Sequence, residues 1–163
     1  MQTRRTFLLA GSAATIATGA GAWSLFGDAA AEAGAFPLSL TEAEWRERLT
    51  PAEFDVLRDH GTEPAFSSPL DDEAREGTYH CAGCAQAVYR SADKFDSGTG
   101  WPSFTRAIDG AVGNSIDRSF LMTRTEEHCA NCGGHLGHVF EDGPEPTGLR
   151  HCINGVALDF VAA

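Results

Sequence analysis

The sequence CANCGGHLGHVF, residues 129–140, places a Cys-x-x-Cys pair directly before two histidines. An earlier pair of the same spacing, Cys81-Ala-Gly-Cys84, stands 44 residues upstream. Two such turns brought together supply four thiolates, the ligand set of a tetrahedral structural zinc ion. The pattern therefore predicts Zn²⁺ held by four cysteines from two distant parts of the chain, namely Cys81, Cys84, Cys129 and Cys132.

Two other interpretations of the cysteine pairs remain open. Disulfides are favoured where a protein is exported to an oxidising compartment. A redox pair of the thioredoxin type needs a position between a strand and a long helix, and neither pair has one. We favour zinc over disulfides, and disulfides over a redox pair. Gly83 and Asn131 suit the inside of such turns, because Gly and Asn tolerate left-handed backbone and leave amides free to point at sulfur.

Composition restricts the function of the chain. With 163 residues, 42% hydrophobic and 21% charged, it has the composition of a globular protein of one domain. Its formal net charge is −11. A general nucleic-acid binder needs a basic face to displace counterions from phosphate, so that class is excluded.

Short apolar runs broken by glycine fill the chain after Gly77. Such runs are typical of strands joined by tight turns. The last run shows alternation at Val156, Leu158 and Phe160. We expect strands at TYHC (78–81), AVYR (87–90), SFLMTR (119–124), GHVF (137–140) and HCINGVALDF (151–160).

Two short helices are predicted before the strands. Thr41 with Glu44, and Thr50 with Glu53, each pair a capping hydroxyl with a carboxylate three residues later. Gly61 is placed to end the second helix. Residues 61–77 contain proline, serine and charge without a period, which predicts a surface loop that wraps the core. The fold class is therefore mainly β with short N-terminal helices.

Residues 1–31 have the form of an export signal. Arg4 and Arg5 precede an uncharged stretch over residues 6–27, and small residues follow at 29–31. The paired arginines resemble a twin-arginine signal. An uncleaved membrane anchor is the alternative, and the Gly, Ala and Thr content disfavours it. We expect a cleaved signal at 1–31, a mature domain at 32–163 and a periplasmic location.

Cys152 is the fifth cysteine and has no partner in the zinc set. A lone cysteine is usually a small buried residue, so its neighbours decide the interpretation. His135 and His138 lie on a glycine-rich segment that leaves the backbone open to close approach, and they can donate protons near a pocket. Trp101, held between Gly100 and Pro102, either lines a pocket or belongs to the core.

At these residues the chain resembles methionine sulfoxide reductase B, which reduces the R epimer of peptide-bound methionine sulfoxide. The resemblance covers almost the whole mature chain. Its motifs are the two Cys-x-x-Cys pairs, KFDSGTGWPSF (94–104), DRSF (117–120), the block CANCGGHLGHVFEDGPEPTGLRHCIN (129–154) and ALDF (157–160).

The resemblance implies two antiparallel sheets packed together, and a role for each matched residue. Cys152 is then the nucleophile that attacks the sulfoxide sulfur. His138 is the leading proton donor with His135 as its partner. Trp101 cradles the substrate methyl group, and Asn154 and Arg150 complete the polar side of the pocket. The four paired cysteines bind zinc, as in the metal-containing branch of the family.

One position departs from the family pattern. The resolving cysteine usually stands in SGCGWPSF, and this chain has Thr99 there. We therefore expect Cys152 to become a sulfenic acid that an external thiol reduces, from a thioredoxin-like protein, a glutaredoxin-like protein or a small molecule. A monomer is the default expectation. Two rival hypotheses are an oxidant sensor based on Cys152 and a zinc domain that binds a partner without catalysis.

Overall fold

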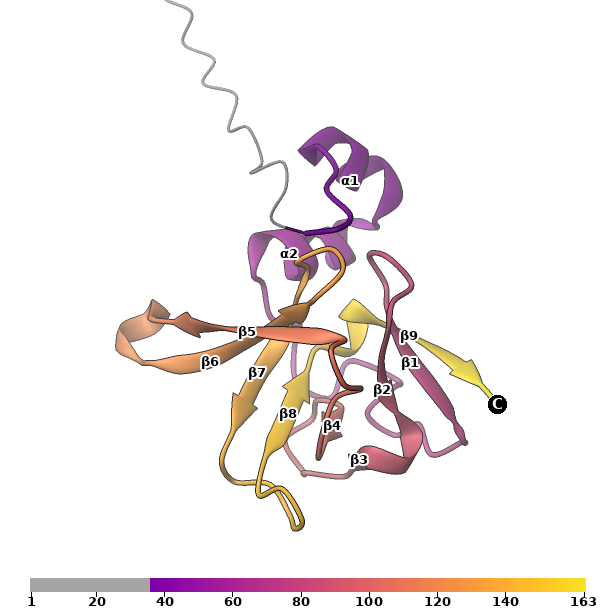
Figure 1. The fold of residues 1–163 in the computed structure, drawn as a ribbon, viewed down its shortest axis with the longest axis vertical. Coiled ribbons are helices and arrows are strands. Elements are labelled where there is room, and N and C mark those ends of the chain that lie inside the picture. Colours follow the sequence, from indigo (N-terminus) through magenta and orange to yellow (C-terminus); the bar gives the residue numbers. More distant parts are fainter. Residues whose placement is uncertain (1–35) are drawn as a thin grey trace, which may run out of the picture.

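The computed structural model describes residues 36–163, apart from the side chain of Phe120. The expected signal at 1–31 lies outside these residues. Over residues 36–163 the chain forms two helices followed by nine strands, with three short 3-10 turns between strands (Figure 1). Within residues 36–163, no helix combines the length and the apolar character needed to cross a membrane.

The two helices begin where the sequence predicts. In α1 (Glu42–Arg48) the Thr41 hydroxyl accepts from the Glu44 amide, and the Glu44 carboxylate accepts from the Thr41 amide at 2.8 Å. Helix α2 (Pro51–Asp59) has the same reciprocal cap at Thr50. Each cap satisfies backbone N–H groups that a helix end leaves free.

The end of α2 differs from the prediction. The helix ends at Asp59, and His60 takes the left-handed conformation with φ of 57° instead of Gly61. The amide of Gly61 then reaches back to the Asp55 carbonyl at 2.8 Å. This bond, from an amide six residues further along the chain, closes the last turn of the helix. Gly61 takes part in the helix stop, but the unusual backbone belongs to a histidine.

All strand pairs are antiparallel, and they form two sheets. The smaller sheet has the order β2-β1-β9, and the larger has the order β3-β4-β8-β7-β6-β5. The sheet prediction is confirmed. The strands are β1 (Gly77–Cys81), β2 (Ala87–Arg90), β3 (Lys94–Phe95), β4 (Ser103–Phe104), β5 (Val112–Asp117), β6 (Arg124–Cys129), β7 (His135–Phe140), β8 (Arg150–Ile153) and β9 (Leu158–Ala162).

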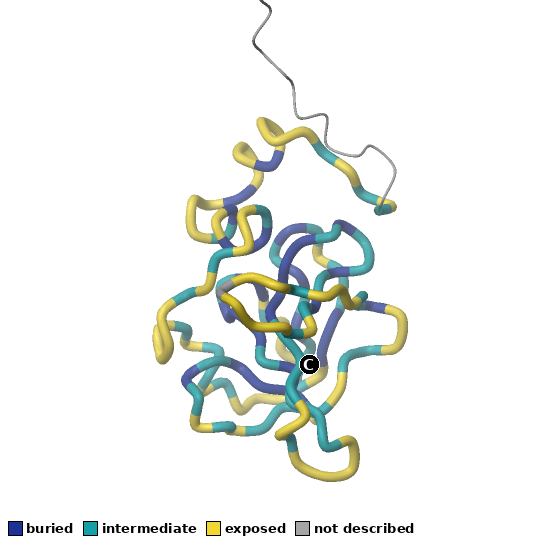
Figure 2. The backbone as a smooth tube through the Cα atoms, turned by 90° about the vertical axis from the view of Figure 1, so that its left-hand side faces the viewer, coloured by how far each residue is buried: buried dark blue, intermediate teal, exposed yellow. Residues whose placement is uncertain are grey.

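Aromatic side chains join the two sheets. Phe104 of β4 stacks on Tyr89 of β2 with ring centroids 4.3 Å apart, and it meets Tyr79 of β1 edge-on at 4.9 Å. All three are fully buried. Burial of a side chain of this size stabilises the fold by about 1.5–3 kcal/mol. The buried parts of the chain run through the middle of the domain, and the turns lie outside (Figure 2).

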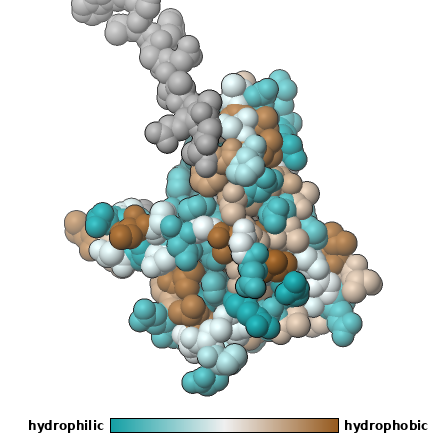
Figure 3. All heavy atoms as spheres, viewed as in Figure 1, coloured by the Kyte–Doolittle hydropathy of each residue, from teal (hydrophilic) through white to brown (hydrophobic). Residues whose placement is uncertain are grey.

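Two of the predicted strands are wrong in extent. In the run SFLMTR, residues 119–121 form the 3-10 turn η2 (Ser119–Leu121), and Arg124 alone belongs to a strand. Asp117 accepts the Ser119 amide at 2.7 Å, and Leu121 has a left-handed backbone with an exposed side chain. The hydrogen bond from the Ser119 amide to Asp117 therefore favours a turn here, although the apolar composition favours a strand. Apolar side chains reach the surface at this end of the β5–β6 hairpin (Figure 3).

The run HCINGVALDF is two strands in different sheets. Strand β8 ends at Ile153, the 3-10 turn η3 (Gly155–Ala157) follows, and β9 begins at Leu158. Asn154 bonds the Leu136 carbonyl through both its backbone and its side-chain amide, which diverts the chain. The turn that follows carries the chain from the larger sheet to the smaller one.

Candidate active site

The four paired cysteines come together where the two sheets meet. Cys81 ends β1 of the smaller sheet, and Cys129 ends β6 of the larger sheet. Their sulfur atoms and those of the two partners all lie within 4.8 Å of one another. The Sγ atoms of Cys81 and Cys132 are 3.7 Å apart, and those of Cys84 and Cys129 are 3.5 Å apart. A tetrahedral site with ~2.3 Å Zn–S bonds needs sulfurs about 3.8 Å apart.

This geometry fits a structural zinc ion. None of the five cysteines, all within residues 36–163, forms a disulfide. Neither pair lies beside a long helix, since one joins β1 to β2 and the other joins β6 to β7. The spacing and the position both disfavour the two alternative interpretations.

The two cysteine turns repeat one backbone geometry. The Ala85 amide donates to the Cys81 carbonyl, and the Gly133 amide donates to the Cys129 carbonyl, each at 2.8 Å. Ala85 and Gly133 carry the positive φ angles, 59° and 67°. The left-handed residue is therefore the one after the second cysteine in each turn, and not Gly83 or Asn131.

Cys152 lies in the middle of the larger sheet. Its backbone in β8 pairs with His138 of β7 on one side and with Ser103 of β4 on the other. The close approach of β7 and β8 requires glycine at 137, because a Cβ atom there would lie 2.1 Å from the Cys152 carbonyl oxygen. This confirms the expectation that glycine leaves the backbone open here.

A cavity of about 130 Å³ brings the expected residues together. Trp101, His138, Cys152 and Asn154 all line it. Trp101 is therefore a pocket residue, held by a hydrogen bond from its indole N–H to the Glu63 carbonyl at 3.1 Å. Gly137 also lines it, and three further lining residues were not singled out from the sequence: Thr62, Arg124 and Phe140.

A larger cavity of about 780 Å³ lies on the other side of Glu63, between α2, the loop 62–75 and β9. Its lining includes Val56, Pro64 and Phe160, but no cysteine or histidine. The chemistry therefore belongs to the smaller cavity.

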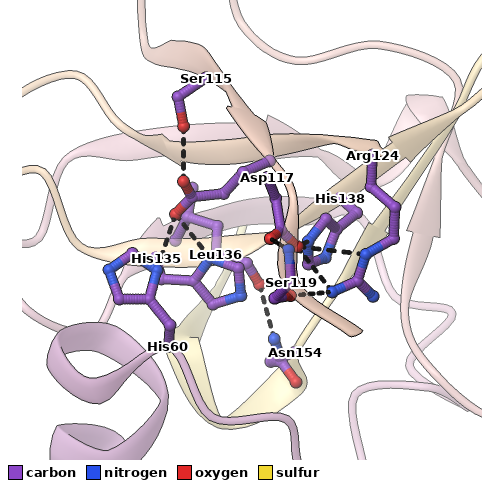
Figure 4. Close-up of polar contacts among 10 residues, drawn as sticks. His60, Ser115, Asp117, Ser119, Arg124, His135, Leu136, His138 and Asn154 are labelled. Carbon is purple, nitrogen blue, oxygen red and sulfur yellow. Dashed lines mark hydrogen bonds and ion pairs between the residues drawn. The ribbon is translucent and has the colours of Figure 1, made fainter. Parts of the chain in front are cut away.

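His138 is fixed by an acidic neighbour. Its Nε2 lies 2.9 Å from Asp117 Oδ2, which also accepts from Arg124 at 2.6 Å (Figure 4). The backbone N–H of Ser119 is the main cause that holds the pKa of Asp117 well below its usual range. An ionised carboxylate thus orients the imidazole, as in many active sites where a histidine moves a proton.

His135 occupies a separate environment. Its Nδ1 lies 2.8 Å from Glu126 Oε1, and burial lowers the pKa of the imidazole. The rings of His135 and His138 meet edge-on with centroids 5.3 Å apart, but His135 does not line the cavity that contains Cys152. A register shift in the β6–β7 pairing accompanies this placement of two histidines spaced by three.

The thiol of Cys152 is held mainly in its neutral form. Burial raises the pKa of Cys152, while the charge of Arg150 and hydrogen bonding by Thr99 act in the opposite direction. Arg150 does not line the cavity. Its guanidinium is paired with Asp142 at 2.9 Å and lies over the Phe140 ring. Its effect on the site is electrostatic.

Thr99 stands beside Cys152 at the end of a chain of hydroxyls. Thr99 contacts Ser97 at 2.8 Å, and Ser97 contacts Ser103 at 2.8 Å. Ser103 is the strand partner of Cys152. Hydrogen bonding by the Thr99 side chain to Cys152 places position 99 beside this thiol.

Glu63 belongs to no motif that the sequence analysis identified. Its carboxylate accepts from the backbone amides of Gly155 and Val156, the latter at 3.1 Å. Its own amide donates to the Asn154 side chain at 3.0 Å, and its carbonyl holds Trp101. One loop residue thus ties two walls of the cavity to the turn after β8. Two of these contacts are made by the backbone amide and carbonyl of Glu63, and a sequence motif of side chains does not reveal such contacts.

Comparison with known proteins agrees with this geometry. The model of the SelR domain matches residues 49–162. The chain belongs to the SelR domain family. Relatives include the peptide methionine sulfoxide reductase MsrB of Agrobacterium fabrum, 51% identical over 121 residues, which are 74% of this chain and 90% of that protein. The MsrB protein of Bradyrhizobium diazoefficiens is 53% identical over 119 residues, 72% of this chain and 86% of its own length.

The SelR match contains every residue that lines the cavity with Cys152, from Thr62 to Asn154. Residues 1–31 lie outside it. The family assignment and the cavity therefore refer to the same part of the chain.

Proposed function

We propose that this SelR-domain protein reduces methionine-R-sulfoxide in peptides and proteins to methionine, with Cys152 as nucleophile. One observation carries the proposal: Cys152, His138 and Trp101 line a single cavity. A sulfoxide needs a soft nucleophile at sulfur, a proton for its oxygen and an apolar surface for its methyl group. Cys152 supplies the nucleophile, His138 supplies the proton, and Trp101 supplies the apolar surface. The relatives named as peptide methionine sulfoxide reductases support the same reaction.

In the first step the Cys152 sulfur attacks the sulfoxide sulfur, and His138 donates a proton to the oxygen. In the adduct, the bond between the two sulfurs and the bond from the substrate sulfur to oxygen then break as the oxygen bonds to the Cys152 sulfur, so Cys152 becomes a sulfenic acid and methionine leaves. The substrate sulfur gains two electrons and Cys152 loses two. Because His135 lies outside the cavity and is held by Glu126, we assign the proton to His138.

Recycling follows with an external thiol. One thiol condenses with the sulfenic acid to give a mixed disulfide and water, and a second thiol releases Cys152. Thr99 cannot form a disulfide, and the four other cysteines form the proposed zinc site. A thioredoxin-like protein, a glutaredoxin-like protein or a small thiol then serves as reductant.

A single-turnover experiment tests the reaction. The zinc-loaded full chain is mixed with a methionine-R-sulfoxide peptide without reductant, and methionine and sulfenic acid are counted. We expect one methionine per chain and a trapped sulfenic acid on Cys152, both lost in Cys152→Ser. No methionine from the intact protein would favour an oxidant sensor, and an internal disulfide to Cys152 would contradict the recycling route.

The zinc ion is proposed as a structural element, bound by the four paired cysteines. When bound, it supplies a cross-link between the two sheets, and the catalytic residues act without it.

Export is proposed from residues 1–31 alone. We propose a twin-arginine signal, cleavage after Ala31 and a monomer in the periplasm. Proteins that take this route fold first, so zinc can bind before export. A reporter fused after Ala35 tests export, and substitution of Arg4 and Arg5 by lysine should abolish it.

A further inference from the structure

A second cluster of metal-binding side chains lies outside the four cysteines. His60, Glu126 and His135 each offer a donor atom, and the three atoms lie within 4.8 Å of one another. They come from the end of α2, from β6 and from the start of β7. Three separate elements thus direct their polar atoms to one point, which neither the zinc site nor the proposed reaction requires.

The two imidazoles meet at a single carboxylate oxygen. His135 Nδ1 lies 2.8 Å and His60 Nδ1 lies 3.1 Å from Glu126 Oε1. Around a tetrahedral ion with Zn–N and Zn–O bonds of ~2.0–2.2 Å, neighbouring donors stand about 3.4 Å apart. The two distances to Glu126 Oε1 reach that value if each histidine moves away from the carboxylate by a few tenths of an ångström, and the exposed His60 side chain can make that movement.

The surroundings resemble those of a built metal site. Ser115 donates to the other oxygen of Glu126 at 2.5 Å, which orients the carboxylate as residues behind metal ligands usually do (Figure 4). His135 is 2% exposed, so its imidazole is held inside the fold. Burial lowers its pKa, and the neutral imidazole is the form that binds metals.

A fourth ligand position faces open space. The cluster borders a cavity of about 500 Å³ that His60, Glu126 and His135 line together with Asp59 and Asp117. Three protein ligands and an open position are the pattern of an exchangeable metal site, whereas structural zinc is enclosed by four ligands. Two imidazoles with one carboxylate suit Zn²⁺, Fe²⁺ or Cu²⁺ better than Mg²⁺ or Ca²⁺.

We propose that His60, Glu126 and His135 form a second, solvent-open site for a divalent transition metal, here represented by Zn²⁺. The site is separate from the four cysteines and does not depend on the proposed reductase activity. The cation replaces the N–H groups that the two imidazoles direct at Glu126, and water completes its coordination.

Zinc titration by calorimetry tests the site. The full chain with Cys152→Ser, which removes the remaining free thiol, is first brought to one zinc per chain by elemental analysis. We expect it to bind one further equivalent of Zn²⁺. His60→Asn, whose side chain tolerates the left-handed backbone, and Glu126→Gln should each abolish that equivalent. Ser115→Ala should weaken it about 10–100-fold.

Asp59→Asn is the matched control, because Asp59 lines the same cavity but lies outside the cluster. It should keep the further equivalent. Circular dichroism and the first zinc equivalent report that each variant is folded. If Glu126→Gln does not fold, the titration of His60→Asn tests the proposal by itself, because His60 is exposed. Absence of the second equivalent in the parent, or its retention in a folded variant of His60 or Glu126, would overturn the proposal.

Discussion

Cys152 and His138 are direct partners across the β7–β8 pairing. The nucleophile and the proposed acid are therefore fixed relative to each other by the sheet, with Gly137 allowing the two strands to approach. Asp117, from the far end of β5, fixes the histidine ring. Rigid strands position reacting groups more exactly than loops do.

Removal of the acid should slow the chemical step. A positioned general acid contributes about 10²–10⁴-fold, so His138→Ala should lower the single-turnover rate by roughly that factor. Asp117→Asn should have a smaller effect of the same kind, because the ring keeps its hydrogen bond but loses the ionised partner. Rapid-quench measurement of methionine release checks both, with Asp109→Asn on an exposed turn as control. An unchanged rate in His138→Ala would show that another group donates the proton.

The reactivity of the Cys152 thiol should increase as pH rises. Burial raises the pKa of the thiol, so the thiolate forms as pH rises and is scarce at neutral pH in the free protein. Alkylation by iodoacetamide should accelerate with pH, with a midpoint above the ordinary thiol value of about 8.5.

Two substitutions should move that midpoint further up. Arg150 and Thr99 lower the pKa of Cys152, so Arg150→Met and Thr99→Val each remove a group that favours the thiolate. Arg46→Met, on the surface of α1, is the control. A midpoint that falls in either variant would show that the group removed does not favour the thiolate.

The sequence predicted features whose cause is local or chemically specific. The capping boxes at Thr41 and Thr50 and the cysteine turns were predictable, because a fixed spacing determines each. SFLMTR was assigned to a strand because apolar composition does not show that Asp117 captures the Ser119 amide. Asp117, Glu126 and Glu63 were not assigned to the site because their partners lie on other strands or are backbone groups, and one sequence does not reveal that proximity.

A second thiol at position 99 should restore an internal route of recycling. Thr99 adjoins Cys152 closely enough to influence its titration. In Thr99→Cys the sulfenic acid should therefore condense with the new thiol and release water. Mass spectrometry after one turnover should show a disulfide between positions 99 and 152, and a thiol count lower by two. Ala43→Cys, on an exposed face of α1, should leave the sulfenic acid in place. The same product from both variants would point to disulfide exchange between molecules.

Loss of one cysteine ligand should unfold the domain. A structural zinc ion contributes on the order of 10 kcal/mol, comparable to the entire stability of a small domain. Cys84→Ser should therefore lower the zinc content to zero per chain and abolish cooperative thermal unfolding, as should a strong chelator on the parent. Circular dichroism with elemental analysis checks this. A cooperative transition that survives without zinc would show that the aromatic contacts between the sheets are sufficient.

Glu63 should affect catalysis as well as stability, because its groups bond both a wall of the cavity and the turn after β8. Glu63→Ala leaves the amides of Gly155 and Val156 without their acceptor, which costs about 1–3 kcal/mol of unfolding free energy. The loop then holds Trp101 and Asn154 less firmly. A displacement of ~1 Å can cost about 100-fold in rate, so kcat/KM should fall by roughly 10–100-fold. Glu63→Gln keeps one acceptor oxygen, so its unfolding free energy and its kcat/KM should lie between those of the parent protein and those of Glu63→Ala.

Glu73→Gln in the same loop is the control, since its carboxylate pairs with Arg75 instead. Urea unfolding and steady-state kinetics separate the two effects, and a loss of stability with unchanged kcat/KM would restrict Glu63 to a structural role.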